Sequence, residues 1–275
     1  MTYSEFEWQT SDGILLSAYR WDPEEPKANV CLVHGLGEHS ARYAHVANLL
    51  NRAKYTFVAF DLRGHGQSQG PRGHSPSLEH FYEDITTFIE KAKSEAPDLP
   101  TFLYGHSLGG LLVLSYATRL SPDLAGVISS GPILRTGFEP PAWKLTLGKV
   151  MRSLMPTFSM SNELDRSGLS RDGDVVHAYN TDPLVHDRIS AQLGIDMLEE
   201  GLWLLNGAPK MKIPTLLMHG SIDRICSPGA SRQFAASAGE LMTSKMWEGL
   251  YHEIHNEPEK DQVIQYLIQW LNDRI

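Results

Sequence analysis

Short apolar runs alternate with amphipathic stretches along most of this 275-residue chain. The runs are as long as strands buried on both faces, and they lie at 30–33, 57–60, 102–104, 124–129 and 213–220. Apolar residues also recur at helical spacing, as in Tyr43, Val46, Ala47 and Leu50, and again in Phe81, Ile85, Phe88 and Ile89. Strands that alternate with helices predict an α/β protein with a mostly parallel central sheet flanked by helices.

The N-terminus has a different pattern. Residues 6–8 and 14–21 are strand-like, and the turn signal Ser11-Asp12-Gly13 lies between them. This pattern predicts a β-hairpin at one edge of the sheet.

Residues 138–209 interrupt the alternation, because they contain helix-like patterns but no convincing central strand. We therefore expect a core formed by 1–137 and 210–275, with an inserted helical cap at 138–209. One helical stripe of the cap consists of Trp143, Leu147, Val150, Met151, Leu154 and Met155, and a second of Ile195, Leu198, Leu202 and Leu205. Such stripes usually seal a helix onto a core.

Two other roles for the cap stay open. Its stripes could line an entrance for an acyl chain. The first helix could also touch a lipid surface transiently, because its only charged residues are Lys144, Lys149 and Arg152.

The segment from Thr101 to Gly110 carries the most specific chemical signal. A short apolar run ends at Gly105-His106-Ser107-Leu108-Gly109, which matches the G-x-S-x-G nucleophile elbow. The chain must turn sharply from strand to helix here, and a Cβ at 105 or 109 would collide with the neighbouring strand and helix. Ser107 is therefore the predicted nucleophile.

A serine hydroxyl needs an imidazole base, and the imidazole needs a carboxylate to fix its tautomer. An elbow serine is followed in the chain by the acid and then by the histidine. Asp223 follows the run at 213–220, and His252 follows a short strand candidate at 244–247. We predict the triad Ser107, Asp223 and His252. Asp61 also ends a strand, but it precedes Ser107, against the usual order.

The amino-acid composition restricts the kinds of partner, metal and cofactor that the protein is expected to bind. The formal net charge is −9 and the sequence pI is about 5.7, which disfavours a nucleic-acid partner. The two cysteines, Cys31 and Cys226, have no zinc or disulfide spacing, and inert packing is the expected role of Cys226. His252-Glu-Ile-His255 lacks the H-E-x-x-H spacing of zinc proteases, so we expect no metal, and no cofactor motif occurs.

The first residues show no basic segment followed by an apolar one, and no apolar run approaches the ~20 residues that span a bilayer. We expect a cytoplasmic protein, peripheral at membranes if the cap touches lipid. The sequence carries no signal for an oligomeric state.

With the elbow, four further segments make the chain resemble the monoacylglycerol lipases and related lysophospholipases, a branch of the α/β-hydrolase superfamily. They are His34 to Tyr43, Arg63 to Ser68, Ala178 to Leu184 and Tyr251 to His255. The resemblance covers nearly the whole chain and implies an α/β-hydrolase fold. It also implies that the backbone N–H groups of Leu36 and Leu108 form an oxyanion hole.

The resemblance further implies a polar glycerol pocket lined by Glu38, Arg42, Tyr179 and His255. Each residue has an ordinary structural alternative. Glu38 and Arg42 could pair with each other at helical spacing, Tyr179 could simply pack, and His255 could cap the last helix.

The function implied by the resemblance is hydrolysis of the ester of a small lipid, a monoacylglycerol, to glycerol and a fatty acid. A lysophospholipase would use the same triad on a different head group. A non-catalytic ligand receptor on the same fold is a third interpretation, which the complete triad disfavours.

Overall fold

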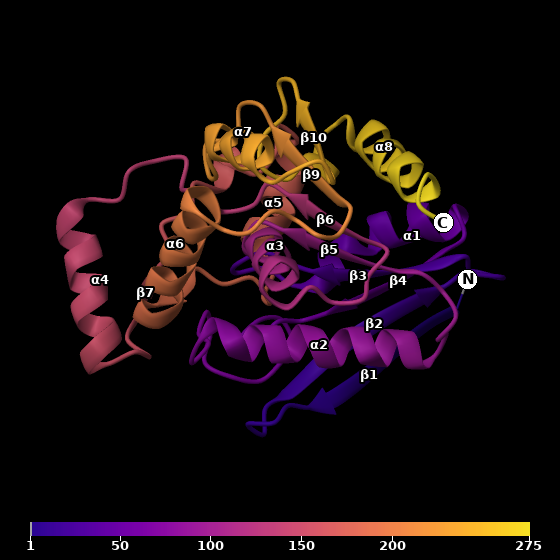
Figure 1. The fold of residues 1–275 in the computed structure, drawn as a ribbon. Coiled ribbons are helices and arrows are strands. Elements are labelled where there is room, and N and C mark those ends of the chain that lie inside the picture. The colour runs from indigo at the N-terminus through magenta and orange to yellow at the C-terminus, as the bar shows by residue number, and fades with distance from the viewer. Residues whose placement is uncertain (1) are drawn as a thin grey trace.

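The computed structural model describes residues 2–275 (Figure 1). An eight-stranded sheet runs through it in the order β1-β2-β4-β3-β5-β6-β9-β10. The strands are β1 (Thr2–Gln9), β2 (Leu15–Asp22), β3 (Ala28–Val33), β4 (Tyr55–Phe60), β5 (Thr101–His106), β6 (Gly126–Ser130), β9 (Thr215–Gly220) and β10 (Met242–Trp247). The strands from β4 to β10 pair in parallel, which confirms the predicted α/β-hydrolase fold.

The predicted edge hairpin is also confirmed. Strands β1 and β2 pair antiparallel, and β2 pairs antiparallel with β4. The hairpin therefore forms one edge of the sheet and leaves the parallel strands in the middle, where both faces are covered.

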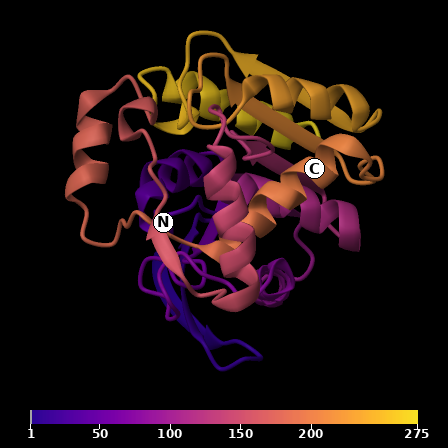
Figure 2. The ribbon, with the colours of Figure 1, turned by 90° about the vertical axis from the view of Figure 1, so that its left-hand side faces the viewer.

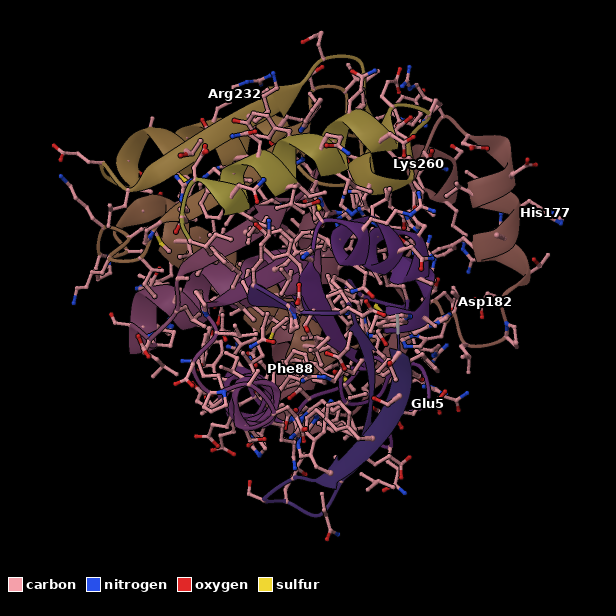
Figure 3. The ribbon with its side chains drawn as sticks, turned by 90° about the vertical axis from the view of Figure 1, so that its right-hand side faces the viewer. Glu5, Phe88, His177, Asp182, Arg232 and Lys260 are labelled. Atoms are coloured by element: carbon pink, nitrogen blue, oxygen red, sulfur yellow. The ribbon has the colours of Figure 1, made fainter. Side chains whose placement is uncertain are left out.

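Helices cover both faces of the sheet. On one face, α2 (Leu78–Ser94), α3 (Leu108–Leu120), α6 (Ala191–Asn206) and α7 (Pro228–Ser237) contribute to one apolar cluster. On the other face, α1 (Ala44–Arg52) and α8 (Lys260–Asn272) contribute to a second. Figure 3 shows Phe88 of α2, which is buried in the first cluster, and His177, which is exposed. Short 3₁₀ turns lie at Ser40–Tyr43, Arg166–Gly168 and Ile254–Asn256.

The chain between β6 and β9 forms a separate group of elements: α4 (Ala142–Leu154), β7 (Ser159–Ser161), α5 (Gly173–Thr181), β8 (Arg188–Ser190) and then α6. The small strands β7 and β8 pair only with each other, antiparallel. Helix α6 packs against α3, and α4 packs against the outside of α6. Figure 2 views the molecule from the side on which α4 lies. Because β6 and β9 are neighbours, this segment leaves and re-enters the sheet at adjacent strands.

The prediction that the first stripe of this segment seals it onto the core is wrong. No residue of α4 is buried, and the exposed fraction is 62% for Trp143 and 78% for Leu154. The second stripe is divided, because Ile195 and Leu205 of α6 are buried whereas Leu202 is exposed. Within residues 2–275, no helix combines the length and the apolar character needed to cross a bilayer.

Candidate active site

The turn between β5 and α3 has the strained geometry of a nucleophile elbow. Ser107 adopts φ 55° and ψ −113°, in the positive-φ region that side chains rarely enter. A Cβ at Gly105 would lie 2.2 Å from the backbone oxygen of Gly109, and one at Gly109 would lie 2.0 Å from that of Val33. Both predicted collisions are therefore present, with the helix and with the neighbouring strand. The strain holds the serine side chain at the carboxyl edge of the sheet.

Asp223 and His252 meet at the same edge. The loop after β9 carries Asp223, whose Oδ2 accepts a hydrogen bond of 2.7 Å from Nδ1 of His252. Its Oδ1 accepts backbone bonds from Ile225 at 2.7 Å and Cys226 at 3.0 Å. With Nδ1 committed to Asp223, Nε2 of His252 is the nitrogen left to exchange a proton.

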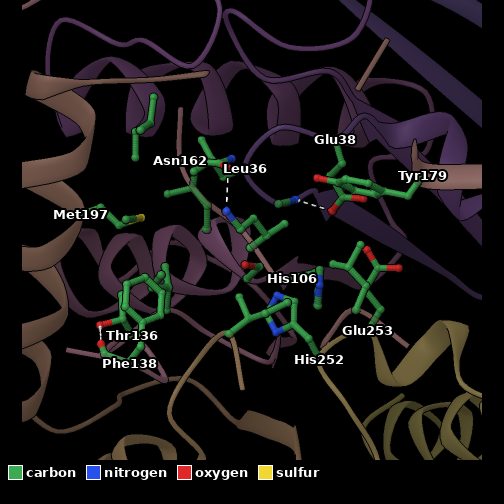
Figure 4. Close-up of a pocket in the computed structure, with 18 residues that line it drawn as sticks. Leu36, Glu38, His106, Thr136, Phe138, Asn162, Tyr179, Met197, His252 and Glu253 are labelled. Atoms are coloured by element: carbon green, nitrogen blue, oxygen red, sulfur yellow. Dashed lines mark hydrogen bonds between the residues drawn. The ribbon is translucent and has the colours of Figure 1, made fainter. Parts of the chain in front are cut away.

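One pocket brings Ser107 and His252 together, whereas Asp223 is not among its lining residues. Ser107 and His252 both line it, beside Leu36, Leu108 and His106 (Figure 4). The Cys226 thiol is buried, its Sγ lies within 4.8 Å of ligand atoms of Asp223 and His252, and burial raises its pKa. Cys226 thus lies against the site as a neutral thiol.

Neighbouring groups shift the pKa values of both Asp223 and His252. Burial alone would raise the pKa of Asp223, but the His252 ring and hydrogen bonds from His219 and His252 hold it well below its usual range. Burial alone would lower the pKa of His252, but the Asp223 carboxylate outweighs this effect and raises it above the ordinary value of 6.5.

Activity should therefore appear only above the ordinary imidazole range. A base must be neutral to accept a proton, and a raised pKa keeps His252 charged to higher pH. We expect kcat/KM for a soluble ester to rise with pH through a midpoint above 6.5. The measurement is a kcat/KM–pH profile, with Ser107→Ala protein as the blank. A profile that is flat from pH 5 to 8 would count against an imidazole base.

Leu36 and Leu108 carry the two backbone N–H groups that are predicted to form the oxyanion hole. Both residues line the pocket beside Ser107. Within the described residues 2–275, neither N–H donates a hydrogen bond. Leu108 is also the first residue of α3, where the helix dipole favours negative charge.

Of the four residues predicted to surround glycerol, only two line the pocket. Glu38 and Tyr179 line the pocket, whereas Arg42 and His255 are not among its lining residues. Arg42 pairs with Glu38, as its structural alternative proposed, and also donates to Glu253 at 2.8 and 2.7 Å. Its guanidinium lies 4.7 Å from the centre of the Tyr179 ring. Arg42 thus supports the lining residues from behind.

His255 lies one layer deeper. Its ring stacks 4.7 Å from that of Tyr43 and lies 4.7 Å from that of His106, which does line the pocket. Helix α8 begins at Lys260 with Glu259 as its N-cap, so His255 does not cap it either. The resemblance therefore identified a neighbour of the pocket wall.

Sequence reasoning missed Glu253. This carboxylate lines the pocket, is buried, and holds Arg42 and Nδ2 of Asn256. The only signal for Glu253 in the sequence is its position between His252 and His255.

The rival acid Asp61 has a structural role. Its Oδ1 accepts bonds of 2.8 and 2.5 Å from the backbone N–H and the hydroxyl of Ser40. Its Oδ2 accepts from the backbone N–H of Gln67 at 2.8 Å and from the Tyr19 hydroxyl at 3.3 Å. These bonds tie Asp61 to the loops after β3 and β4.

An apolar groove continues from the pocket towards α4 and α6. The two cavities share Thr136, Phe138, Asn162, Ile189 and Met197. Beyond them the groove is lined by aliphatic and aromatic side chains, including Leu145, Leu147, Met151, Phe158, Ile195 and Leu198. The site therefore has an apolar end and, at Glu38 and Tyr179, a polar one.

Asp223, Cys226 and His252 also offer three possible metal-ligand atoms within 4.8 Å of one another. Asp223 and His252 are already bonded to each other, and burial keeps the thiol protonated. A thiolate is the form that binds metal, so this chemistry suits proton transfer better than metal binding.

Comparison with known proteins gives a consistent picture. The family model described as serine aminopeptidase, S33, matches residues 24–259. A monoacylglycerol lipase of Mycolicibacterium smegmatis is 34% identical over 273 residues, which cover 98% of this chain and 97% of the relative. An abhydrolase domain-containing protein of Dictyostelium discoideum is 40% identical over all of this chain, which spans only 30% of that protein.

A solved structure agrees with these sequence matches. The crystal structure of the Paleococcus ferrophilus monoacylglycerol lipase superposes with a TM-score of 0.85 at 36% identity, and the match covers 100% of both chains. The chain belongs to the monoacylglycerol lipase branch of the α/β-hydrolase superfamily, within the family described as serine aminopeptidase, S33.

Proposed function

We propose that this protein is a serine hydrolase that cleaves the ester bond of monoacylglycerols into glycerol and a fatty acid. The observation that carries the proposal is the strained Ser107 in one pocket with His252, whose Nδ1 is hydrogen-bonded to Asp223. The substrate class is supported by the relatives, which are monoacylglycerol lipases.

In the proposed reaction, Nε2 of His252 removes the Ser107 proton as the hydroxyl attacks the ester carbonyl. The N–H groups of Leu36 and Leu108 donate to the oxyanion that forms, each contributing about 3–4 kcal/mol if they behave like other oxyanion donors. His252 then returns the proton to the departing glycerol oxygen. Water activated by the same nitrogen attacks the acyl-enzyme and releases the fatty acid.

The two ends of the site match the two ends of the substrate. The apolar groove between α4 and α6 suits one acyl chain, because burial of each methylene contributes about 0.8 kcal/mol. Glu38 and Tyr179 suit the glycerol hydroxyls, with Glu253 also in the pocket lining and Arg42 behind them. His255 supports the wall through its contact with His106.

We expect monoacylglycerols to be much better substrates than di- or triacylglycerols, because buried Glu38 and Tyr179 leave little room for a second chain. The measurement is kcat/KM for mono-, di- and triolein in identical detergent, with lysophosphatidylcholine alongside. Equal values for mono- and triolein would contradict a narrow polar end. Preference for the lysophospholipid would favour the lysophospholipase, and no turnover of any ester would favour the receptor.

The exposed face of α4 suits transient contact with a membrane surface. Trp143, Leu147, Val150 and Leu154 are exposed there, above the apolar groove. Lys144 is paired with Glu163 and Arg152 with Glu199, and the third cation of the helix, Lys149, is exposed beside the apolar residues. We expect Trp143→Ala with Leu154→Ala to reduce co-sedimentation with phosphatidylcholine vesicles, and unchanged binding would contradict the contact.

A further inference from the structure

The carboxylate of Asp223 receives a hydrogen bond from a second histidine. Nε2 of His219 lies 2.9 Å from Asp223 Oδ2, the same oxygen that bonds His252 at 2.7 Å. With the two backbone donors on Oδ1, Asp223 is held by four bonds. His219 lies in β9 and has no exposed surface.

A polar imidazole is unusual at this position of β9, because the neighbouring side chains on this face are apolar. Residues alternate between the two faces of β9, so His219 points to the same side as Leu217, which packs in the cluster containing Ala230 and Phe234 of α7. A buried imidazole destabilises the fold unless both ring nitrogens are paired. Both are paired here, because Nδ1 lies 2.7 Å from the hydroxyl of Ser231 in α7.

The two hydrogen-bond partners of the His219 ring determine which ring nitrogen carries the hydrogen. A carboxylate only accepts hydrogen bonds, so Nε2 of His219 must carry the hydrogen that points to Asp223. The Ser231 hydroxyl can donate to Nδ1 and thereby hold a neutral imidazole in this tautomer. Ser231, His219, Asp223 and His252 thus form one chain of hydrogen bonds that ends at the base.

We infer that His219 is a positioning residue for the reaction, which fixes the Asp223 carboxylate against His252 while Ser231 fixes the tautomer of His219. This inference rests on the proposed function, because it assigns a role to a residue behind the proposed acid. His219 is not among the residues that line the pocket. Its loss should therefore change kcat and leave KM nearly unchanged.

The experiment compares two variants at the same position. Leucine in His219→Leu fills similar space but cannot donate, whereas glutamine in His219→Gln can place an amide N–H near the position of Nε2. We expect His219→Leu to lower kcat for a soluble ester by about tenfold, on the scale of one lost bond to a charged group. His219→Gln should recover most of this loss.

The pH dependence of kcat distinguishes a positioning role of His219 from a role in packing alone. The titratable groups that face the His252 ring are Asp223, Cys226 and His106. Without the bond from His219, the Asp223 charge acts on His252 alone, so the acid limb of kcat should move to higher pH in His219→Leu. A residue that only packs would change the melting temperature but not this limb.

Ser231→Ala tests the far end of the chain if the leucine variant folds poorly. It leaves His219 in place and removes only the partner of Nδ1, while Nε2–H still faces Asp223, so we expect a changed ¹⁵N shift at Nδ1 with a smaller loss of kcat. Wild-type kcat and acid limb in folded His219→Leu, or in Ser231→Ala, would overturn the inference. Equal losses in His219→Leu and His219→Gln would also overturn it. The proposed function fails separately, if Asp223→Asn remains active.

Discussion

Replacing Ser107 with alanine should lower ester turnover on the order of 10⁶-fold in kcat, the scale on which a triad nucleophile acts. The hydroxyl is the atom that would form the acyl-enzyme, and the elbow otherwise keeps its structure. The backbone N–H of Ser107 donates to Ser130 at 2.9 Å, and this bond does not need the side chain. We therefore expect a folded but inactive protein, measured with a p-nitrophenyl ester and by thermal unfolding.

Ser121 provides a matched control. It also has a positive φ, 46°, but it is exposed at the C-terminal end of α3. Ser121→Ala places alanine at a positive φ in the left-handed region and should keep full turnover. A fluorophosphonate should label wild type and Ser121→Ala at Ser107, and should not label Ser107→Ala. Labelling at another residue, or comparable turnover in Ser107→Ala, would show that the elbow is not the nucleophile.

Replacing Asp223 with asparagine should cost about 10⁴-fold in kcat, the loss expected when a triad histidine is held in the wrong tautomer. Asparagine keeps the size of the side chain but can present an N–H to Nδ1 of His252. The ring would then carry its hydrogen on Nε2, where the base must accept one. The measurement is kcat at saturating ester, corrected for the folded fraction by thermal unfolding.

Asp61→Asn is the matched control, because Asp61 is also buried beyond the end of a strand. Its carboxylate binds Ser40, Gln67 and Tyr19, so the substitution should lower the melting temperature and preserve kcat per folded molecule. Near-normal activity in Asp223→Asn, with a large loss in Asp61→Asn, would exchange the two assignments.

The elbow could be predicted because its physical cause is local. Gly105 and Gly109 are required by atoms within a few residues or on the adjacent strand, and the motif records that crowding. The strands could be predicted because the parallel ones are buried on both faces and appear as apolar runs.

The role of α4 could not be predicted in the same way. Helical periodicity shows that a helix has an apolar face, but it does not show what covers that face. In α4 the face borders a groove and solvent, so a stripe that resembled a sealing surface remains unburied.

Two buried polar residues that sequence reasoning did not assign, His219 and Glu253, show a second limit. Glu253 reaches Arg42 only after segments 211 residues apart meet, and His219 reaches Asp223, four residues later, only through the turn that follows β9. His219 did leave a trace in the sequence, as the one titratable residue in the apolar run of β9. Such an interruption indicates a paired polar group, but it does not identify the partner.

The junction of β6 and β9 has a consequence for how such proteins diversify. The long excursion between these strands starts and ends at neighbours in the sheet, so it can be shortened, lengthened or exchanged without reordering the strands. Its outer part, from α4 to β8, forms one wall of the groove, whereas Ser107, Asp223 and His252 all lie outside it. The wall of the apolar groove can therefore be replaced while the proposed triad is inherited unchanged, and a graft between relatives can use the same two junctions.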